Sequence, residues 1–376
     1  MNLIVKDVKM YLDNSATTKV REEVLKEMFP YFTSKYGNPS SLHDKGLEAK
    51  NAVFDAKERI AKILKCSPEE LVFTGSGTES INLGILGLVN KKKHIITSKV
   101  EHPAVLETCK YLENEGFKVS YLGVDSGGFV SLEELESLIT KDTFLISIQY
   151  ANNEVGVIQD VNGIGKIAKK HGVCFHTDAC QAGQLDLSVK NIDLMTLNSS
   201  KVYGPKGVGL LYVRKGLKLK PILFGGGQQG GLRSGTENVS GIIGFAKALE
   251  LRQKDKDLVK LRDYMIKEIL KIDKAVLNGD SKRRLPNNIN VSFIDVEGES
   301  LVLLLNESEI YCSTGSACAS SKIEPSHVIL AVTDSHERAH SSLRVSFGYD
   351  FTKKDADVFL DVLKESVEKL RRISPL

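Results

Sequence analysis

The sequence predicts an α/β fold with a mostly parallel sheet, because short apolar runs alternate with amphipathic stretches between about residues 70 and 215. The apolar runs, interpreted as strands, lie at 71–73, 94–97, 118–122, 143–149, 173–176, 192–197 and 208–213. Amphipathic stretches at 104–114, 132–139 and 162–170 predict helices between several of these strands. Because such sheets bind ligands at the carboxyl ends of their strands, polar residues there are the first candidates for a site.

The second part of the chain predicts a smaller α+β domain. A Gly-rich stretch at 225–235 is followed by a helical pattern over 241–272, which is compatible with one long connecting helix. After residue 285 the pattern predicts strands at 289–293 and 309–312, and helices at 299–305 and 354–371.

Composition excludes several classes of protein. The 376 residues are 41% hydrophobic and 26% charged with a net charge of +3, which gives no support for a nucleic-acid or membrane-surface partner. No apolar stretch approaches the ~18 residues that cross a bilayer, and the first residues lack the pattern of a secretion signal. Six scattered cysteines indicate a reducing, intracellular compartment. The spacings Cys174/Cys180 and Cys312/Cys318 are wider than those of zinc sites, so we expect no metal site formed by the protein alone.

Two residues at neighbouring strand ends suggest a cofactor. Asp178 closes one apolar run, and Lys201 follows the next in the Ser- and Gly-rich connection 198–207. Pyridoxal phosphate (PLP) needs a lysine for its Schiff base and a carboxylate that keeps its ring nitrogen protonated. A lone lysine on a turn is more often solvated, so the interpretation depends on the motifs around it.

A second motif favours phosphate binding. Residues 75–80, Gly-Ser-Gly-Thr-Glu-Ser, follow a predicted strand and lead into a helix. Small residues and the free amides of a helix N-terminus suit a phosphate group, although an ordinary Ser/Thr helix cap is the alternative.

The glycine-rich stretch 225–230 matches Gly-x-Gly-x-x-Gly, the pattern of dinucleotide-binding proteins. Gly231, Ser234 and Gly235 follow at once, so no helix can begin where the pyrophosphate would bind. We expect this loop to bring Arg233, Ser234 and Thr236 to a phosphate instead.

Three further residues are candidates for direct chemistry. His102 lies between a strand and a helix, either stacked on a cofactor or as an ordinary polar histidine. Cys318 lies in a run of small residues, which favours a reactive thiol over a structural one, with a solvated cysteine as the alternative. Arg344 interrupts an apolar run and needs a partner, either a substrate carboxylate or a protein salt bridge.

Together these motifs resemble the cysteine desulfurases of the NifS/IscS type, within the class V, fold-type I PLP enzymes. The similarity covers nearly the whole chain, in stretches 11–18, 37–41, 151–156, 203–207, 233–238, 313–318 and 324–327. The resemblance implies the PLP-dependent transferase fold type I, with a seven-stranded, mostly parallel sheet in the large domain and a smaller α+β domain. We place the large domain at 16–255 and the small domain at 1–15 and 256–376.

The resemblance also implies a role for each matching residue. Lys201 would form the Schiff base, Asp178 would contact the ring nitrogen, and His102 would stack on the ring and help to move protons. The other implied contacts are Asn153 and Gln181 at the ring hydroxyl, Gly77, Thr78, Asn198 and Ser200 at the phosphate, Thr236 at the phosphate of the other subunit, and Arg344 at the substrate carboxylate with Asn14 near it.

The implied activity is the conversion of L-cysteine to L-alanine with a persulfide on Cys318, in a cytoplasmic homodimer that passes sulfur to an iron–sulfur scaffold protein. Cys318 is also implied as a transient iron–sulfur ligand. Two departures from the family pattern concern phosphate binding and the subunit contact: Asn-Ser-Ser-Lys at 198–201 replaces Ser-x-His-Lys, and Gln-Gln-Gly stands at 228–230. The alternatives are a related PLP lyase or transaminase, such as selenocysteine lyase, and a non-enzymatic homologue.

Overall fold

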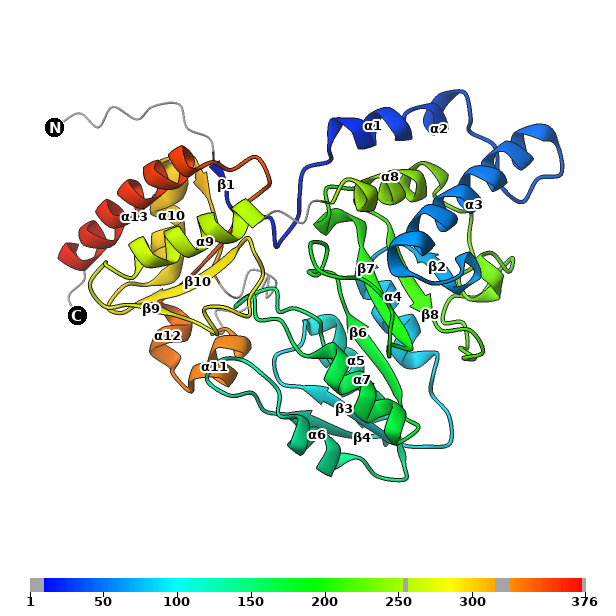
Figure 1. Ribbon diagram of the computed structural model, residues 1–376, viewed down its shortest axis with the longest axis horizontal. Coiled ribbons are helices and arrows are strands. Elements are labelled where there is room, and N and C mark those ends of the chain that lie inside the picture. Colours follow the sequence, from blue (N-terminus) through cyan, green and yellow to red (C-terminus); the bar gives the residue numbers. More distant parts are fainter. Residues whose placement is uncertain (1–9, 253–255, 315–324, 374–376) are drawn as a thin grey trace.

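The computed structural model describes residues 10–252, 256–314 and 325–373, and a seven-stranded sheet forms the centre of its larger part, on the right in Figure 1. The strand order is β2-β8-β7-β6-β5-β3-β4. The neighbouring pairs among β3 to β7 are parallel, whereas β8 is antiparallel to both β2 and β7. The predicted mostly parallel sheet is therefore confirmed. Its strands are β2 (Leu71–Thr74), β3 (His94–Ser98), β4 (Lys118–Leu122), β5 (Thr143–Ser147), β6 (Cys174–Asp178), β7 (Leu194–Asn198) and β8 (Gly209–Val213).

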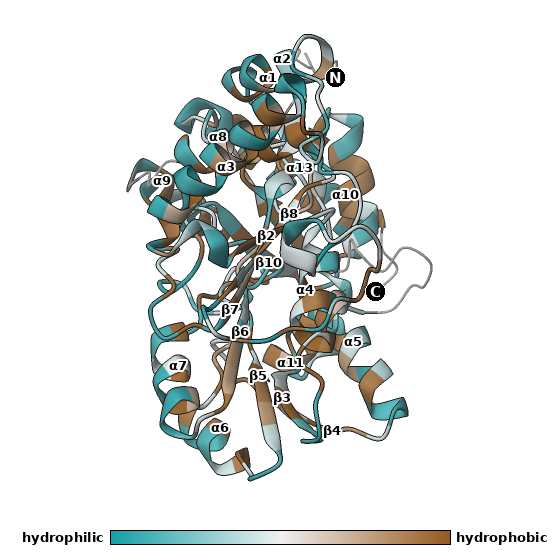
Figure 2. Ribbon diagram, turned by 90° about the vertical axis from the view of Figure 1, so that its right-hand side faces the viewer, coloured by the Kyte–Doolittle hydropathy of each residue, from teal (hydrophilic) through white to brown (hydrophobic). Residues whose placement is uncertain are grey.

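Helices cover both faces of this sheet, which explains why its strands are nearly continuous apolar runs. Successive residues of one strand point to opposite faces, so Leu210 of β8 packs in one core and Leu211 in the other. Figure 2 shows the hydrophobic colour along β5 and β6 and a mixture of both colours on α6 and α7. The helices of this part are α1 (Glu22–Met28), α2 (Pro30–Thr33), α3 (Asp44–Leu64), α4 (Gly77–Leu86), α5 (Pro103–Asn114), α6 (Leu132–Leu138), α7 (Val161–Lys170) and α8 (Val239–Glu250).

A separate core forms the smaller part, on the left in Figure 1. Its antiparallel sheet has the order β12-β10-β9, and β1 pairs in parallel with β11 beside it. The second, smaller α+β unit is thus confirmed, while the boundaries at 15/16 and 255/256 stay a prediction. Its elements are β1 (Met10–Tyr11), α9 (Lys256–Ile269), β9 (Ala275–Leu277), β10 (Asn288–Phe293), α10 (Gly298–Glu307), β11 (Ile310–Tyr311), α11 (His327–Thr333), α12 (His336–His340), β12 (Ser342–Ser346) and α13 (Lys353–Ile373).

The helical pattern over 241–272 forms two helices rather than one long connecting helix. α8 ends at Glu250 and α9 begins at Lys256. Ile242 of α8 packs in the core of the large sheet, whereas Met265 of α9 packs in the small core. The apolar face of α8 therefore packs in the large part and that of α9 in the small part. One straight helix would not reach both cores.

The helix α11 lies against the large part of the molecule. Val328, Ile329 and Val332 of this helix form a buried cluster with Val100 and Val155, which belong to loops after β3 and β5. This cluster joins the small body to the loops at the carboxyl edge of the large sheet. Within the described ranges, no helix combines the length and apolar character needed to cross a membrane.

Candidate active site

A cavity of about 260 Å³ opens at the carboxyl edge of the large sheet. Ten of the candidate residues from the sequence line it, namely Gly77, Thr78, His102, Asn153, Asp178, Gln181, Asn198, Ser200, Lys201 and Arg344. Their shared location follows from the topology, because parallel strands end at one edge of the sheet. Asp178 and Asn198 are the last residues of the neighbouring strands β6 and β7.

Lys201 is presented to the cavity by a short 3-10 turn directly after β7. Its Nζ donates to the carbonyl oxygen of Ser15 at 2.7 Å and to that of Ala16. Asp178 fixes the start of the loop that follows β6, since its Oδ1 accepts from the backbone N–H of Cys180 at 2.9 Å. An amine and a carboxylate thus line one cavity, as a PLP site requires.

His102 forms the N-cap of α5, and its Nδ1 accepts from the backbone N–H of Ala104 at 3.0 Å. In the neutral ring the proton is therefore on Nε2. Burial lowers the pKa of His102, Asp178 opposes that shift, and Lys201 and His327 add to it. A neutral, flat imidazole that lines the cavity suits stacking on an aromatic cofactor.

The start of α4 forms the end of the cavity that suits a phosphate group. Ser76 caps the helix by accepting from the backbone N–H of Glu79 at 3.1 Å. A Cβ at position 77 would lie 2.8 Å from the Sγ of Cys180, so glycine lets the helix start approach this wall. Ser200 donates only a long hydrogen bond of 3.4 Å to Asn198. Free helix amides, small side chains and a nearby hydroxyl fit a phosphate group.

The residues of the Gly-rich loop that were predicted to bind phosphate lie away from the cavity of their own chain. Arg233 donates from Nε to Oε1 of Glu79 at 2.8 Å, and Ser234 is buried beside the loop backbone. Thr236 is exposed, and none of the three residues lines the cavity. Within one chain, therefore, this loop does not bring them to the phosphate end. The role of Thr236 toward another subunit stays a prediction.

Arg344 forms a protein salt bridge, one of its two predicted partners, and its role toward a substrate carboxylate stays a prediction. It lines the cavity although its side chain is only 1% exposed. Nη2 donates to Asp13 Oδ1 at 2.7 Å, and Nη1 donates to the carbonyl oxygen of Asn153 at 3.3 Å. The salt bridge with Asp13 orients the guanidinium. Asn14 is held by the carbonyl oxygen of Ser346 at 3.0 Å and lines a second cavity instead of this one.

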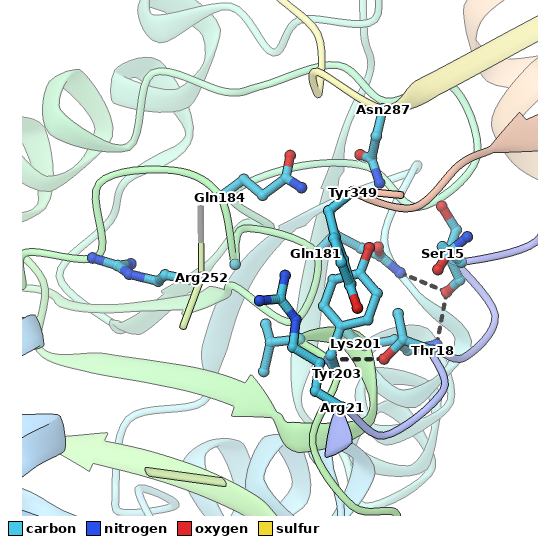
Figure 3. Close-up of a pocket in the computed structure, with 13 residues that line it drawn as sticks. Ser15, Thr18, Arg21, Gln181, Gln184, Lys201, Tyr203, Arg252, Asn287 and Tyr349 are labelled. Carbon is cyan, nitrogen blue, oxygen red and sulfur yellow. Dashed lines mark hydrogen bonds between the residues drawn. The ribbon is translucent and has the colours of Figure 1, made fainter. Parts of the chain in front are cut away.

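Figure 3 shows this second cavity, on which the sequence pattern gave no indication. It shares Ser15, Gln181 and Lys201 with the first cavity. The guanidinium carbon of Arg21 lies 3.7 Å from the ring centroid of Tyr349 and 5.0 Å from that of Tyr203. These stacked side chains brace the segment that carries Lys201, because the backbone N–H of Arg21 also donates to the Tyr203 carbonyl.

Further residues of the first cavity were not singled out from the sequence, namely Ser15, Ala16, Ile81, Gln149, Ala151 and Cys180. Several of them are immediate neighbours of predicted residues. Their position beside a strand-end motif was the only feature of the sequence that could have identified them as lining residues. Cys318 lies outside the described residues.

The chain is similar throughout to known proteins. The family model described as aminotransferase class-V matches residues 10–359. Proteins called cysteine desulfurase IscS from Methanosarcina thermophila and Dictyoglomus turgidum are each 50% identical, over 100% and 98% of this chain and 96% of each relative. A solved NifS-like protein has a TM-score of 0.91 at 40% identity, covering 96% of this chain and 100% of its own. A structure titled "SspA in complex with cysteine" has a TM-score of 0.82 at 37% identity over 90% and 98% of the two chains.

The family's cofactor is PLP, and the cavity fits it. Lys201, Asp178 and the neutral ring of His102 line one space, with the start of α4 at its phosphate end. The chain therefore belongs to the class-V aminotransferase family of PLP-dependent enzymes and, within it, to the cysteine desulfurases of the IscS type.

Proposed function

We propose that this enzyme converts L-cysteine to L-alanine and transfers the sulfur to Cys318. The main support is that Lys201, Asp178, His102 and Arg344 line one cavity in a chain 50% identical to IscS proteins along its length. A lysine, a carboxylate and an arginine there meet the needs of the cofactor and of an amino-acid carboxylate.

Bound PLP supplies an electron sink that eases removal of the substrate α-proton. Lys201 would hold the cofactor and would then move that proton, since it lines the cavity. Asp178 would keep the cofactor's ring nitrogen protonated, and His102 would support the ring, since both line the same cavity. Arg344, oriented by Asp13, binds the substrate carboxylate through its planar fork.

The sulfur leaves the substrate by attack of a thiolate. The Cys318 thiolate attacks the substrate sulfur, an S–S bond forms, and the bond from that sulfur to the β-carbon breaks. The electron pair of the broken bond stays with the carbon skeleton, and its protonation yields alanine. The products are alanine and a persulfide on Cys318.

The environments of the described cysteines support Cys318 as the nucleophile. Burial raises the pKa of the Cys66, Cys109 and Cys312 thiols to about 12, and it raises those of Cys174 and Cys180 as well. A thiol must ionise to attack. At neutral pH these five cysteines are therefore poor nucleophiles.

We further propose a cytoplasmic homodimer that delivers sulfur to an iron–sulfur scaffold protein, with Cys318 as a transient cluster ligand. Large apolar side chains on and near α1 to α3 are exposed in the single chain, which supports a homodimer in which a second copy covers them. They include Phe29, Phe32, Tyr36 and Leu42, with exposed fractions of 65%, 60%, 71% and 102%.

The test is to incubate the PLP-loaded protein with L-cysteine, then to measure alanine and to map the added sulfur by mass spectrometry. One sulfur atom on Cys318 and stoichiometric alanine are expected. Alanine without any persulfide on Cys318 would contradict the proposal and favour a lyase that acts without this thiol.

A further inference from the structure

The start of α11 is tied to the large part of the molecule by a buried side-chain contact. Ser326 is 2% exposed and caps α11, because its Oγ accepts from the backbone N–H of Ile329 at 3.1 Å. The same hydroxyl donates to Oε2 of Glu154, which is 5% exposed. Ser326 and Glu154 are 172 positions apart in the chain. We call this pair the Glu154–Ser326 contact.

Glu154 also belongs to the loop that forms the cavity wall. Its neighbour Asn153 lines the cavity, and the Asn153 carbonyl accepts from Arg344 at 3.3 Å. Burial raises the pKa of Glu154, while the hydrogen bond from Ser326 and the nearby His327 and Arg344 oppose the shift. Glu154 itself does not line the cavity, so its side chain lies one residue behind this wall.

A second contact ties the same turn to the opposite wall. Nε2 of His327 lies 3.0 Å from the carbonyl oxygen of Glu101, and His102 follows Glu101 directly. The two contacts attach the first turn of α11 to the loops that carry Asn153 and His102. The apolar cluster around Val328 and Ile329 holds the rest of this helix on the same loops.

The position of Cys318 in the sequence gives this attachment a consequence. Cys318 lies eight residues before Ser326, and eight residues span at most about 26–29 Å. The site at which Ser326 is fixed therefore bounds the positions that the thiol can reach. The attachment lies next to the cavity wall, since Asn153, the neighbour of Glu154, lines the cavity.

We infer that Glu154 is a positioning residue for sulfur transfer, which acts through Ser326 to fix the downstream end of the segment that carries Cys318. The inference rests on the proposed role of Cys318. Glu154 takes part in no bond-making step. It keeps the attacking thiol within reach of a substrate that Arg344 and the cofactor already hold.

The experiment compares Glu154→Ala, Ser326→Ala and Glu154→Gln in the PLP-loaded, full-length protein. After one addition of L-cysteine, the persulfide on Cys318 is followed in time by mass spectrometry. We expect its rate to fall about ten- to hundredfold in both alanine variants, as a small misplacement of a reacting group does. Glu154→Gln should stay within about threefold of the parent, because its amide oxygen still accepts from Ser326.

Two readouts separate positioning from general damage. The KM for L-cysteine and the change in cofactor absorbance on adding L-cysteine should match the parent in all three variants. Hydrogen exchange in the cofactor-free protein should speed up at the first amides of α11 in both alanine variants. The matched control is Ser335→Ala, which removes the same kind of cap from α12, where Ser335 accepts from the Arg338 N–H at 3.2 Å, and should keep the parent rate.

Parent-like persulfide rates in both alanine variants would overturn the inference, as would an equal loss in Ser335→Ala. A Glu154→Gln variant as slow as Glu154→Ala would also overturn it, since the hydrogen bond would then not be the cause. The proposed function fails separately, if the parent protein itself forms no persulfide on Cys318.

Discussion

The two walls of the cavity are held in different ways. The wall from the large part is made of residues that end or directly follow strands of one sheet, such as Asp178 and Lys201. The wall from the small part depends on contacts between distant segments, such as Arg344 with Asp13, which are 331 positions apart. The first wall holds the residues predicted to bind the cofactor. The second wall holds the residue predicted to bind the substrate carboxylate, so a change there should leave cofactor binding intact. Changes on the two walls should therefore have separable effects.

The largest effect is expected on the strand-end wall. Lys201→Ala should lose covalently bound PLP and reduce turnover by at least about 10³-fold, because the anchor and the proton carrier are the same group. Borohydride treatment of the parent should label Lys201. Lys206→Ala is the matched control, since Lys206 is exposed nearby. Label on Lys206 instead would contradict the assignment of Lys201 as the Schiff-base lysine, and with it the comparison of the two walls.

The next effect should separate cofactor binding from sulfur transfer. Cys318→Ser should bind PLP and L-cysteine normally and form no persulfide, because serine supplies no thiolate. Cys312→Ser should keep the persulfide, since burial and Asp13 raise the pKa of the Cys312 thiol to about 12. The two variants are compared by mass spectrometry after L-cysteine. The reverse outcome would mean that the wrong cysteine has been assigned.

Arg344→Lys tests the second wall directly. Lysine lacks the planar fork that binds a carboxylate through two hydrogen bonds, so we expect KM for L-cysteine to rise about ten- to hundredfold with PLP retained. Arg338→Lys serves as the control, because Arg338 donates to Asn278 and lies outside the cavity. Loss of PLP from Arg344→Lys would show that the two walls are not independent.

A smaller effect is expected at the phosphate end. Ser200→Ala should weaken PLP retention roughly tenfold, the low end for losing a hydrogen bond to a charged group. The hydroxyl is available because its contact with Asn198 is long, at 3.4 Å. Ser200→His should hold PLP at least as tightly. Dialysis against a competitor for PLP measures both, and unchanged retention in Ser200→Ala would make Ser200 a structural linker.

The smallest effect concerns acid stability of the strand-end wall. Burial lowers the pKa of His176 to about 4, against 6.5 for an unperturbed histidine. The unfolded chain then binds the extra proton between those values, so stability falls as pH falls through this window. We expect the contribution of His176 to drop by about 1 kcal/mol between pH 7.5 and 5.5. Urea unfolding should show a shallower acid slope in His176→Gln, and an equal slope would contradict the shift.

Glu101 acts in the opposite direction over the whole range from pH 5.5 to 7.5. Burial raises its pKa to about 8 from 4.5, so its contribution is present below pH 4.5 and is lost as pH rises toward 8. The parent curve therefore contains both slopes. The difference between the parent and His176→Gln isolates the histidine.

Much of the fold and part of the site follow from local sequence. Apolar runs of strand length, separated by amphipathic stretches, predict a sheet covered on both faces, and residues that end those runs must share its edge. Asp178, Lys201, His102 and Gly77 were predictable in this way, because each lies within a few residues of a strand end. Local pattern is sufficient where one strand positions one side chain.

The tertiary structure alone decided the remaining contacts. The sequence shows that Arg344 needs a partner, but the pairing with Asp13 depends on how the segment after β1 packs beside β12, 331 positions away. Arg233 pairs with Glu79 rather than lining the cavity, and Ser326 meets Glu154 across 172 positions. Contacts between segments far apart in the chain depend on the packing of whole elements, which no local pattern contains. For that reason the sequence by itself predicts the cofactor chemistry, and only the folded chain shows which contacts fix the second wall of the cavity.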